Sequence, residues 1–198
     1  MKKIKEVLIG TNNRGKYEEI CNLLPSNVKK YSLKQFNILS PKETGKSFRE
    51  NALIKASYFS KKTSLICLSD DSGLEIETLK DKPGIFSSRW SGKKNNFNLA
   101  IKKVYKEMNK INKDWKNKNK AQFVCCLTIF WPDKKSFSAE GIAKGKISKI
   151  KKGKKGFGYD PIFMPTGYNK TFAEMRPQLK MSMDHRFKAY LKIKKYFV

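Results

Sequence analysis

The sequence predicts an α/β fold in a single domain, and three observations lead to it. Short apolar runs at 6–10 and 65–68 have the length and composition of buried strands. The stretch 47–61 repeats apolar residues with the 3.6-residue period of a helix. Two longer segments, 121–131 and 135–147, are separated by a Pro-Asp pair and predict a hairpin of long strands.

The first strand, 6–10, leads into a polar loop and then an amphipathic helix. The loop has the sequence Thr11-Asn12-Asn13-Arg14-Gly15-Lys16. Its backbone N–H groups precede a helix, and it adds hydroxyl, amide and cationic side chains, which together can cradle a phosphate. The spacing G-x-x-x-x-G-K-[ST] of a P-loop is absent. An ordinary capped helix start is the alternative interpretation.

A second strand at 28–33 precedes a loop that ends near Gly45, and a helix follows to about Lys61. Ser47 and Glu50 have the S-x-x-E spacing of a capping box at its start. Lys55 lies in the same helix, and Glu43 lies in the loop just before it. Taken alone, Glu43 is equally explained as a solvated loop carboxylate.

The run 65–68 continues into Ser69-Asp70-Asp71-Ser72-Gly73, which predicts an acidic turn at the end of a buried strand. Two carboxylates at that place need a compensating cation. Mg²⁺ prefers oxygen ligands and takes one or two carboxylates, with water and phosphate completing its shell. Gly73 is expected to let the chain turn sharply. A solvated surface turn is the alternative.

The second half of the chain continues with a strand at 74–79, a helix at 95–113 and the hairpin. A segment rich in glycine and aromatic residues then follows, Gly156-Phe157-Gly158-Tyr159-Asp160-Pro161-Ile162-Phe163. Its glycines permit close approach of a ligand, and an aromatic ring offers a stacking face to a base. A tight aromatic turn explains the same residues. A last helix is expected after Asp184.

Composition narrows the class of protein. The chain has 198 residues, of which 39% are hydrophobic, so it can bury a core. No apolar run approaches the length of about 20 residues that a membrane span needs. The four cysteines form no C-x-x-C pair, which predicts reduced, buried thiols in a cytoplasmic protein. A single histidine disfavours a His-based zinc site.

The formal net charge of +27 attracts polyanions, either a nucleic acid or a nucleoside triphosphate. The lysines are spread along the chain rather than gathered in one block. We therefore attribute most of the charge to background composition and expect nucleic-acid binding to be non-specific at most.

Six short motifs occur in a fixed order along nearly the whole chain. They are 11–16 (T-x-N-x-x-K), 47–55 (S-F-x-E-N-A-x-x-K), 68–74, 83–92, 156–163, and Lys180 with His185-Arg186. In this set and order they resemble the inosine triphosphate pyrophosphatase family, the noncanonical purine NTP pyrophosphatases. The resemblance implies a mixed central β-sheet flanked by helices, in two lobes with an active-site cleft between them, over residues 1–198. It also implies a homodimer.

The resemblance implies hydrolysis of ITP, dITP or XTP to the monophosphate and pyrophosphate. Asp71 and Glu43 are expected to hold Mg²⁺, with Asp70 and Glu50 close by, where they either support these ligands or replace one of them. The family treats the residue that matches Asp71 as the general base. The expected substrate-binding residues are Thr11, Asn12, Asn13, Arg14, Gly15, Lys16, Lys55, Ser72, Arg89, Phe157, Gly158, Tyr159, Asp160, Lys180, His185 and Arg186.

Within that set, Lys16, Lys55 and Arg89 are expected to clamp the polyphosphate and Phe157 to stack on the base. A backbone N–H or Arg186 is expected to recognise the 6-oxo group of the purine. The chain departs from the family pattern in two places. Asp184 stands where serine is usual before His-Arg, and either residue can cap a helix. Trp90 stands where tyrosine is usual, and we expect it to pack.

Two other functions remain open at this point. A basic nucleic-acid-binding protein explains the lysines but not the ordered motifs or the paired carboxylates. A related pyrophosphatase that acts on another base, such as a modified pyrimidine, explains the motifs equally well. Tight, strongly salt-dependent DNA binding without triphosphatase activity would indicate the nucleic-acid-binding protein. A panel of substrates would distinguish a pyrophosphatase for another base.

Overall fold

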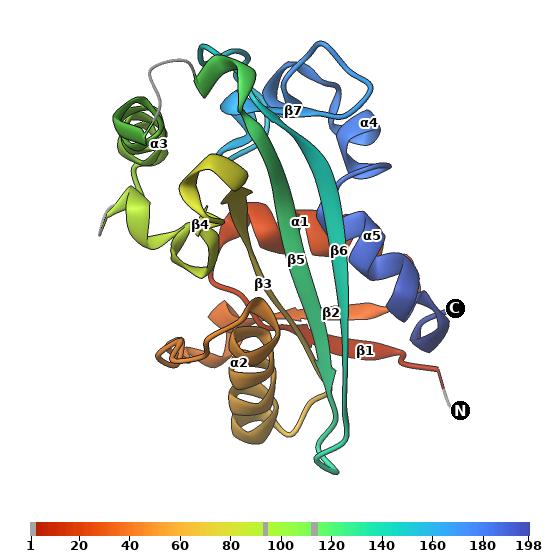
Figure 1. Ribbon diagram of the computed structural model, residues 1–198. Helices are drawn as coiled ribbons and strands as arrows, with labels where there is room; N and C mark the ends of the chain where they lie inside the picture. Colours follow the sequence, from red (N-terminus) through yellow and green to blue (C-terminus); the bar gives the residue numbers. More distant parts are fainter. Residues whose placement is uncertain (1–2, 93–94, 112–114) are drawn as a thin grey trace. The chain divides into compact units, whose positions relative to one another are not determined.

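A computed structural model describes residues 3–92, 95–111 and 115–198 of the chain (Figure 1). Its strands are β1 (Glu6–Ile9), β2 (Lys29–Ser32), β3 (Cys67–Ile76), β4 (Lys82–Pro83), β5 (Lys120–Phe130), β6 (Ser136–Ile147) and β7 (Phe163–Pro165). Its α-helices are α1 (Arg14–Leu23), α2 (Phe48–Thr63), α3 (Phe97–Ile111), α4 (Pro177–Met181) and α5 (His185–Ile193). Short 3₁₀ turns connect several of them.

The strands form a mixed sheet. Over the described residues their order is β2-β1-β3-β5-β6-β7, and β4 pairs with β3. β1 runs parallel to β2 and to β3. β4 pairs antiparallel with β3, and β7 pairs antiparallel with β6. The expected α/β class, with a mixed sheet and flanking helices, is therefore what the structure contains.

The chain divides into two compact units. The first takes its described residues from Met1–Asp71, Cys125–Gly141 and His185–Val198, and the second from Ser72–Val124 and Ile142–Asp184. The boundary falls between Asp71 and Ser72, within β3. The functional residues are therefore divided between the two units.

In the first unit, the parallel strands β1 and β3 bury side chains on both faces. Ile9 and Leu68 belong to an apolar cluster with residues of α1 and α5. Leu8 and Cys67 belong to a second cluster with Phe59 of α2. Because successive strand residues point to opposite faces, α2 covers one face and α1 with α5 the other (Figure 1). The two faces determine where the charged residues of β3 point.

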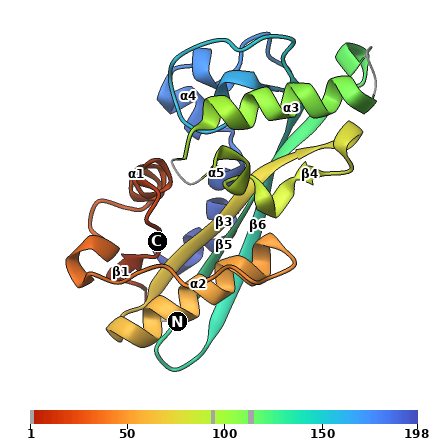
Figure 2. The same cartoon turned by 90° about the vertical axis from the view of Figure 1, so that its left-hand side faces the viewer.

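The core of the second unit includes the buried side chains of α3, the helix labelled in Figure 2. Ala100, Ile101, Val104 and Met108 keep the period expected from the sequence, and all four are buried. They pack with residues of β3, β5, β6 and the 156–163 segment. Trp90 packs against the same cluster, which confirms the packing role expected for it. The expected end of this helix, at 113, lies outside the described residues.

The acidic turn predicted after residue 68 is wrong. β3 is one continuous strand from Cys67 to Ile76, so Asp70 and Asp71 lie within it and Gly73 does not end it. The turn was expected because Asp, Ser and Gly are common turn formers. Here basic side chains distant in sequence stabilise the two carboxylates, so the strand continues.

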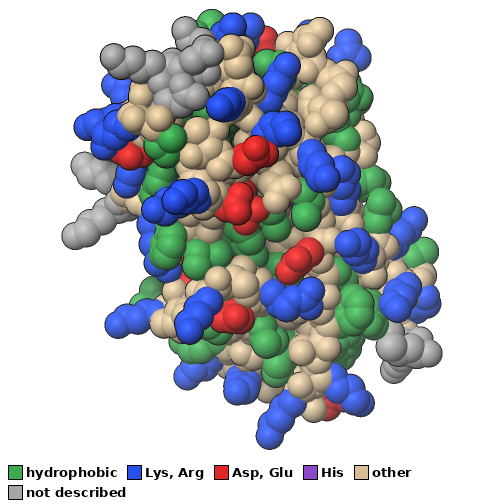
Figure 3. All heavy atoms as spheres, viewed as in Figure 1, with side chains coloured by type: hydrophobic (Ala, Val, Ile, Leu, Met, Phe, Trp, Pro, Cys, Tyr) green, Lys and Arg blue, Asp and Glu red, His purple; other side chains and the backbone are tan. Residues whose placement is uncertain are grey.

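Other surface expectations have clear outcomes. Figure 3 shows Lys and Arg side chains scattered over the visible face rather than gathered into one block. Cys67, Cys125 and Cys126 are free and buried, while Cys21 is half-buried. Among the described residues, none of the helices combines the length and the apolar character that crossing a membrane requires.

Candidate active site

Helix α2 presents the first part of the site because its N-terminus is fixed by capping. The Ser47 hydroxyl accepts a hydrogen bond from the Glu50 N–H at 3.1 Å, as the predicted capping box requires. The reciprocal bond differs: the Glu50 carboxylate accepts from the Lys46 N–H at 2.8 Å. Glu50 is exposed at this position, which places it in the capping of the helix.

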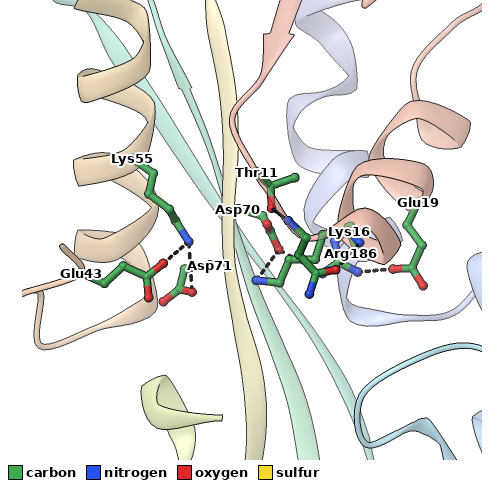
Figure 4. Close-up of polar contacts among 9 residues, drawn as sticks. Thr11, Lys16, Glu19, Glu43, Lys55, Asp70, Asp71 and Arg186 are labelled. Carbon is green, nitrogen blue, oxygen red and sulfur yellow. Dashed lines mark hydrogen bonds and ion pairs between the residues drawn. The ribbon is translucent and has the colours of Figure 1, made fainter. Parts of the chain in front are cut away.

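Lys55, two turns into α2, lies between two carboxylates (Figure 4). Its Nζ is 2.6 Å from Glu43 Oε1 and 3.4 Å from Asp71 Oδ1. Burial disfavours the ammonium, but the negative charges of Asp71, Asp70 and Glu43 outweigh it and raise the pKa of Lys55. Lys55 therefore stays charged and holds Glu43 against the strand that carries Asp71.

Asp71 keeps one oxygen unsatisfied. The residue is 5% exposed, and its Oδ2 is buried without a hydrogen-bond partner among the described residues. Burial raises the pKa of Asp71, and Lys55 and Lys16 only partly offset this effect. A buried carboxylate oxygen without a partner is costly unless a ligand completes the site.

The donor set around Asp71 fits Mg²⁺. Glu43 and Asp71 already share one cation, the Lys55 ammonium, and Asp71 Oδ2 has no hydrogen-bond partner within residues 3–92, 95–111 and 115–198. No group of three or more His, Cys, Asp or Glu side chains that could hold a metal occurs in the part of the chain described. Mg²⁺ does not need such a group, because it binds through one or two carboxylates and keeps several waters.

Asp70 points to the opposite face of β3 and is fully buried there (Figure 4). Its Oδ2 lies 3.2 Å from Lys16 Nζ and 3.0 Å from Arg186 Nη2. Burial alone would raise the pKa of Asp70, but Lys16, Arg186 and Lys55 outweigh it and lower that pKa. Arg186 also pairs with Glu19 of α1. The neighbouring aspartates thus differ in charge compensation: nearby cations outweigh the effect of burial on the pKa of Asp70, whereas burial prevails at Asp71.

The polar segment 11–16 is partly helical, which corrects the expected loop. α1 begins at Arg14, so Arg14, Gly15 and Lys16 form its first turn. Asn13 caps the helix, with its Oδ1 accepting from the Lys16 N–H at 3.0 Å. The reason is that Asn13 is a strong N-cap residue that the loop interpretation did not use.

The side chains of this segment have different partners. The Thr11 hydroxyl accepts from the Asn13 N–H at 3.2 Å, and Asn12 donates to the Ser40 hydroxyl at 2.9 Å. Arg14 is exposed and pairs with Glu18 one turn along. Two cations of this segment, Arg14 and Lys16, were expected to bind phosphate. Of these two, it is Lys16 that forms an ion pair with the buried carboxylate of Asp70.

The expected residues of the second unit form their own cluster. Lys180 Nζ lies 2.6 Å from Asp160 Oδ2, and both side chains are buried. The same carboxylate oxygen accepts from the Phe157 N–H at 2.9 Å. The ammonium of Lys180 is 5.1 Å from the centre of the Phe157 ring. This network fixes the ring that was expected to stack on a base.

Other expected residues of this unit have structural contacts. Tyr159 is 2% exposed, and its hydroxyl donates to the Ser87 carbonyl at 2.9 Å, so its ring belongs to the core. The Arg89 guanidinium lies 4.8 Å from the centre of the Phe86 ring. Gly158 has a φ of +66°, which favours glycine there. Ser72 follows Asp71 in β3.

The structure thus brings together Lys16, Glu43, Lys55, Asp70, Asp71 and Arg186 in the first unit, and Phe157, Asp160 and Lys180 in the second. His185 is buried at the start of α5, directly after Asp184.

Sequence reasoning missed two residues of this network. Glu19, the partner of Arg186, lies three positions after Lys16 and so shares a helix face with it. The second is Asn51 of α2, which is buried and accepts a hydrogen bond from the Gly45 N–H. Asparagine is a poor helix former, so its place inside a predicted helix could have indicated a special contact.

Known proteins are similar to this chain over nearly its whole length. The model of the Ham1 family matches residues 7–196. A dITP/XTP pyrophosphatase of Flavobacterium psychrophilum is 40% identical over 93% of this chain and 94% of its own. One of Bacillus cereus (strain ATCC 14579) is 38% identical over 98% of this chain and 95% of its own.

Solved structures match equally well. A HAM1 protein from Coxiella burnetii gives a TM-score of 0.87 at 33% identity, covering 97% of this chain and 98% of its own. The Staphylococcus aureus Ham1 protein gives 0.84 at 30% identity, covering 97% of each chain. These matches confirm the expected fold class and the resemblance found in the motifs. The chain belongs to the Ham1 family.

Proposed function

We propose that this chain is a nucleoside-triphosphate pyrophosphatase that converts dITP, ITP and XTP to the monophosphate and pyrophosphate. Its family and the dITP/XTP pyrophosphatases similar to it support this activity. One structural observation carries the proposal: a buried lysine joins Glu43 to Asp71, whose second oxygen has no partner among the described residues. That arrangement is suited to a divalent cation and a polyphosphate.

Glu43 and Asp71 are the residues proposed to hold Mg²⁺. When bound, the ion would neutralise phosphate charge and orient a water for attack on the α phosphorus. Asp70 is a weaker candidate ligand, because Lys16 and Arg186 already contact one of its oxygens. Glu50 is weaker still, because its carboxylate accepts from the Lys46 N–H.

The chain's own side chains bind and orient the substrate. Lys16 and Lys55 are buried or half-buried cations proposed to bind the negative charge of the triphosphate, and Arg89 adds a third. Asp71 is proposed as the general base, since its unsatisfied oxygen can accept the proton of the attacking water. The backbone N–H groups at the start of α1 are proposed to bind phosphate oxygens.

Base recognition is proposed for Phe157, Gly158, Tyr159 and Asp160, with Lys180, His185 and Arg186. Phe157 supplies the stacking face, and Tyr159 acts through its backbone since its ring is buried. A donor that meets the 6-oxo group of hypoxanthine or xanthine would lack a partner when adenine binds. An unpaired buried donor costs about 1–3 kcal/mol, or roughly tenfold to a hundredfold in specificity.

Residues 1–198 are proposed to act as one catalytic domain with two lobes, as a homodimer in the cytoplasm. Binding to nucleic acid is expected to be non-specific and sensitive to salt, because the charge of +27 is spread over the chain.

The test is a substrate panel with product identification. The purified protein with Mg²⁺ should release pyrophosphate from dITP, ITP and XTP at least about tenfold faster than from ATP. Orthophosphate as the first product, or equal rates with all bases, would refute the proposal. Modified pyrimidine triphosphates belong in the panel, since preference for one of them would assign the enzyme another base.

Asp71→Asn tests the proposed base directly. The variant keeps the shape of the side chain but removes its negative charge, so turnover should fall by at least about a hundredfold with the fold intact. The matched control is Asp133→Asn, the same chemical change at the exposed hairpin turn, where Asp133 pairs with Lys135. Retained turnover in Asp71→Asn would remove Asp71 from the mechanism.

A further inference from the structure

Glu43 lies in a segment with little regular structure of its own. Between Asn37 and Ser47 the chain forms no helix or strand. The carboxylate of Glu43 is nevertheless held 2.6 Å from Lys55 Nζ. A proposed metal ligand on an irregular segment needs anchors, because a side chain that wanders loses the geometry that Mg²⁺ demands.

Asn51 supplies such an anchor from α2. Its Oδ1 accepts a hydrogen bond from the Gly45 N–H at 2.9 Å. The direction of this bond fixes the orientation of the amide, because a backbone N–H can only meet the oxygen. Asn51 is fully buried, and its Nδ2 has no hydrogen-bond partner among the described residues. Burying an amide nitrogen without a partner destabilises the fold, and the hydrogen bond that the Asn51 oxygen accepts from Gly45 gives a reason for keeping the residue there.

Asn51 and Lys55 hold the segment as a pair. They lie four positions apart in α2 and therefore share one face of the helix. Asn51 binds the backbone of Gly45, and Lys55 binds the carboxylate of Glu43. One helix face thus contacts the segment at two positions, which lie two residues apart. Two contacts fix orientation as well as position, which a single contact does not.

Gly45 is fitted closely to this anchor. A Cβ at position 45 would lie 2.7 Å from Asn51 Oδ1 and 2.6 Å from the Glu50 Cβ, both closer than real Cβ contacts. The segment thus approaches α2 at the position of Gly45 as closely as the backbone allows. Any larger residue there must move the segment away from the helix.

We infer that Asn51 is a positioning residue for the proposed magnesium site: through Gly45 it holds the Glu43 carboxylate in the place where it can share an ion with Asp71. The inference rests on the proposed function, in which Glu43 and Asp71 are the ligands. Asn51 contacts neither ion nor substrate and acts only through the 43–47 segment. Loss of Asn51 removes the hydrogen bond to the Gly45 N–H, two residues after Glu43, so ion binding must also order this part of the segment.

The first test needs no metal. Hydrogen exchange of the Gly45 amide should be slow in the wild type and about tenfold faster in Asn51→Ala, because one hydrogen bond is lost. Asn119→Ala is the matched control: Asn119 also bonds a backbone group, donating to the Ile147 carbonyl at 2.8 Å, but in the other unit. It should leave Gly45 exchange unchanged. Unchanged exchange in Asn51→Ala would overturn the inference.

The second test is the Mg²⁺ dependence of pyrophosphate release from dITP. In Asn51→Ala the Mg²⁺ concentration for half-maximal rate should rise about tenfold, while the rate at saturating Mg²⁺ stays within about threefold. A purely structural role would lower the amount of active protein without moving that concentration. Gly45→Ala should act in the same direction, and it serves if Asn51→Ala does not fold.

The two hypotheses fail in different ways. A wild type that releases no pyrophosphate overturns the proposed function, whereas Gly45 exchange still tests the anchor. An active wild type whose Mg²⁺ dependence is unchanged in Asn51→Ala and Gly45→Ala overturns only the role of Asn51. An equal rise in Asn119→Ala would also overturn it, because the effect would then be one of general stability.

Discussion

Asp70→Asn should destabilise the protein strongly. Asp70 is fully buried between the cations of Lys16 and Arg186, and Arg186 itself is 1% exposed. The substitution preserves shape but leaves two partly uncompensated cations. Removing one partner of a buried ion pair costs about 3–5 kcal/mol, and because Arg186 keeps Glu19 we expect about 3 kcal/mol. For a chain of this size that corresponds to a Tm lower by about 6–12 °C.

The effect should have a defined pH dependence. The pKa of Asp70 is lowered in the folded protein, so its contribution is complete above the unfolded-state pKa of about 3.9 and is lost only as the pH falls through the native value. The difference in unfolding free energy between wild type and Asp70→Asn should therefore be the same at pH 8 and pH 5.5.

Urea unfolding, followed by circular dichroism at both pH values, measures this difference. Asp133→Asn, at an exposed turn, is the control and should unfold as the wild type does. A difference below about 1 kcal/mol for Asp70→Asn, or one that disappears between pH 8 and pH 5.5, would refute the compensation argument.

Two further substitutions test the second unit and the core. Phe157→Leu removes the proposed stacking face and should raise KM for dITP about tenfold with kcat within a few-fold, since stacking contributes about 1–3 kcal/mol per base; steady-state kinetics check this, and a fall in kcat alone would contradict it. Phe59→Ala removes a fully buried ring between α2 and β1 and should lower the unfolding free energy by about 3–5 kcal/mol in urea titrations. A loss under about 1 kcal/mol would show that this cluster is not well packed.

The elements that local patterns determine were predicted from the sequence. β1, α2 and the β5–β6 hairpin lie where apolar periodicity placed them, because burial of one face is encoded within each segment. The start of α1 was placed too late. Its boundary depends on Asn13, one side chain whose capping bond the apolar pattern does not reveal.

The acidic pair shows what local patterns cannot give. Asp70 is compensated by Arg186, which lies 116 residues away in the sequence. No window around residue 70 contains that partner, so turn propensity decided the prediction and was wrong. The roles of Glu19 and Asn51 were missed for the same reason, because each depends on a contact with another segment.

The alternation of β3 has a consequence for protein engineering. Asp70 and Asp71 owe their different chemistry to the side of a single extended backbone on which each one emerges. Deleting one residue upstream in that strand would turn each aspartate to the opposite face, and Asp71 would then take the place between the cations that Asp70 has now. A graft of this pair into a new scaffold must therefore transplant an extended segment with a helix on either side, since a loop tip would expose both acids to water.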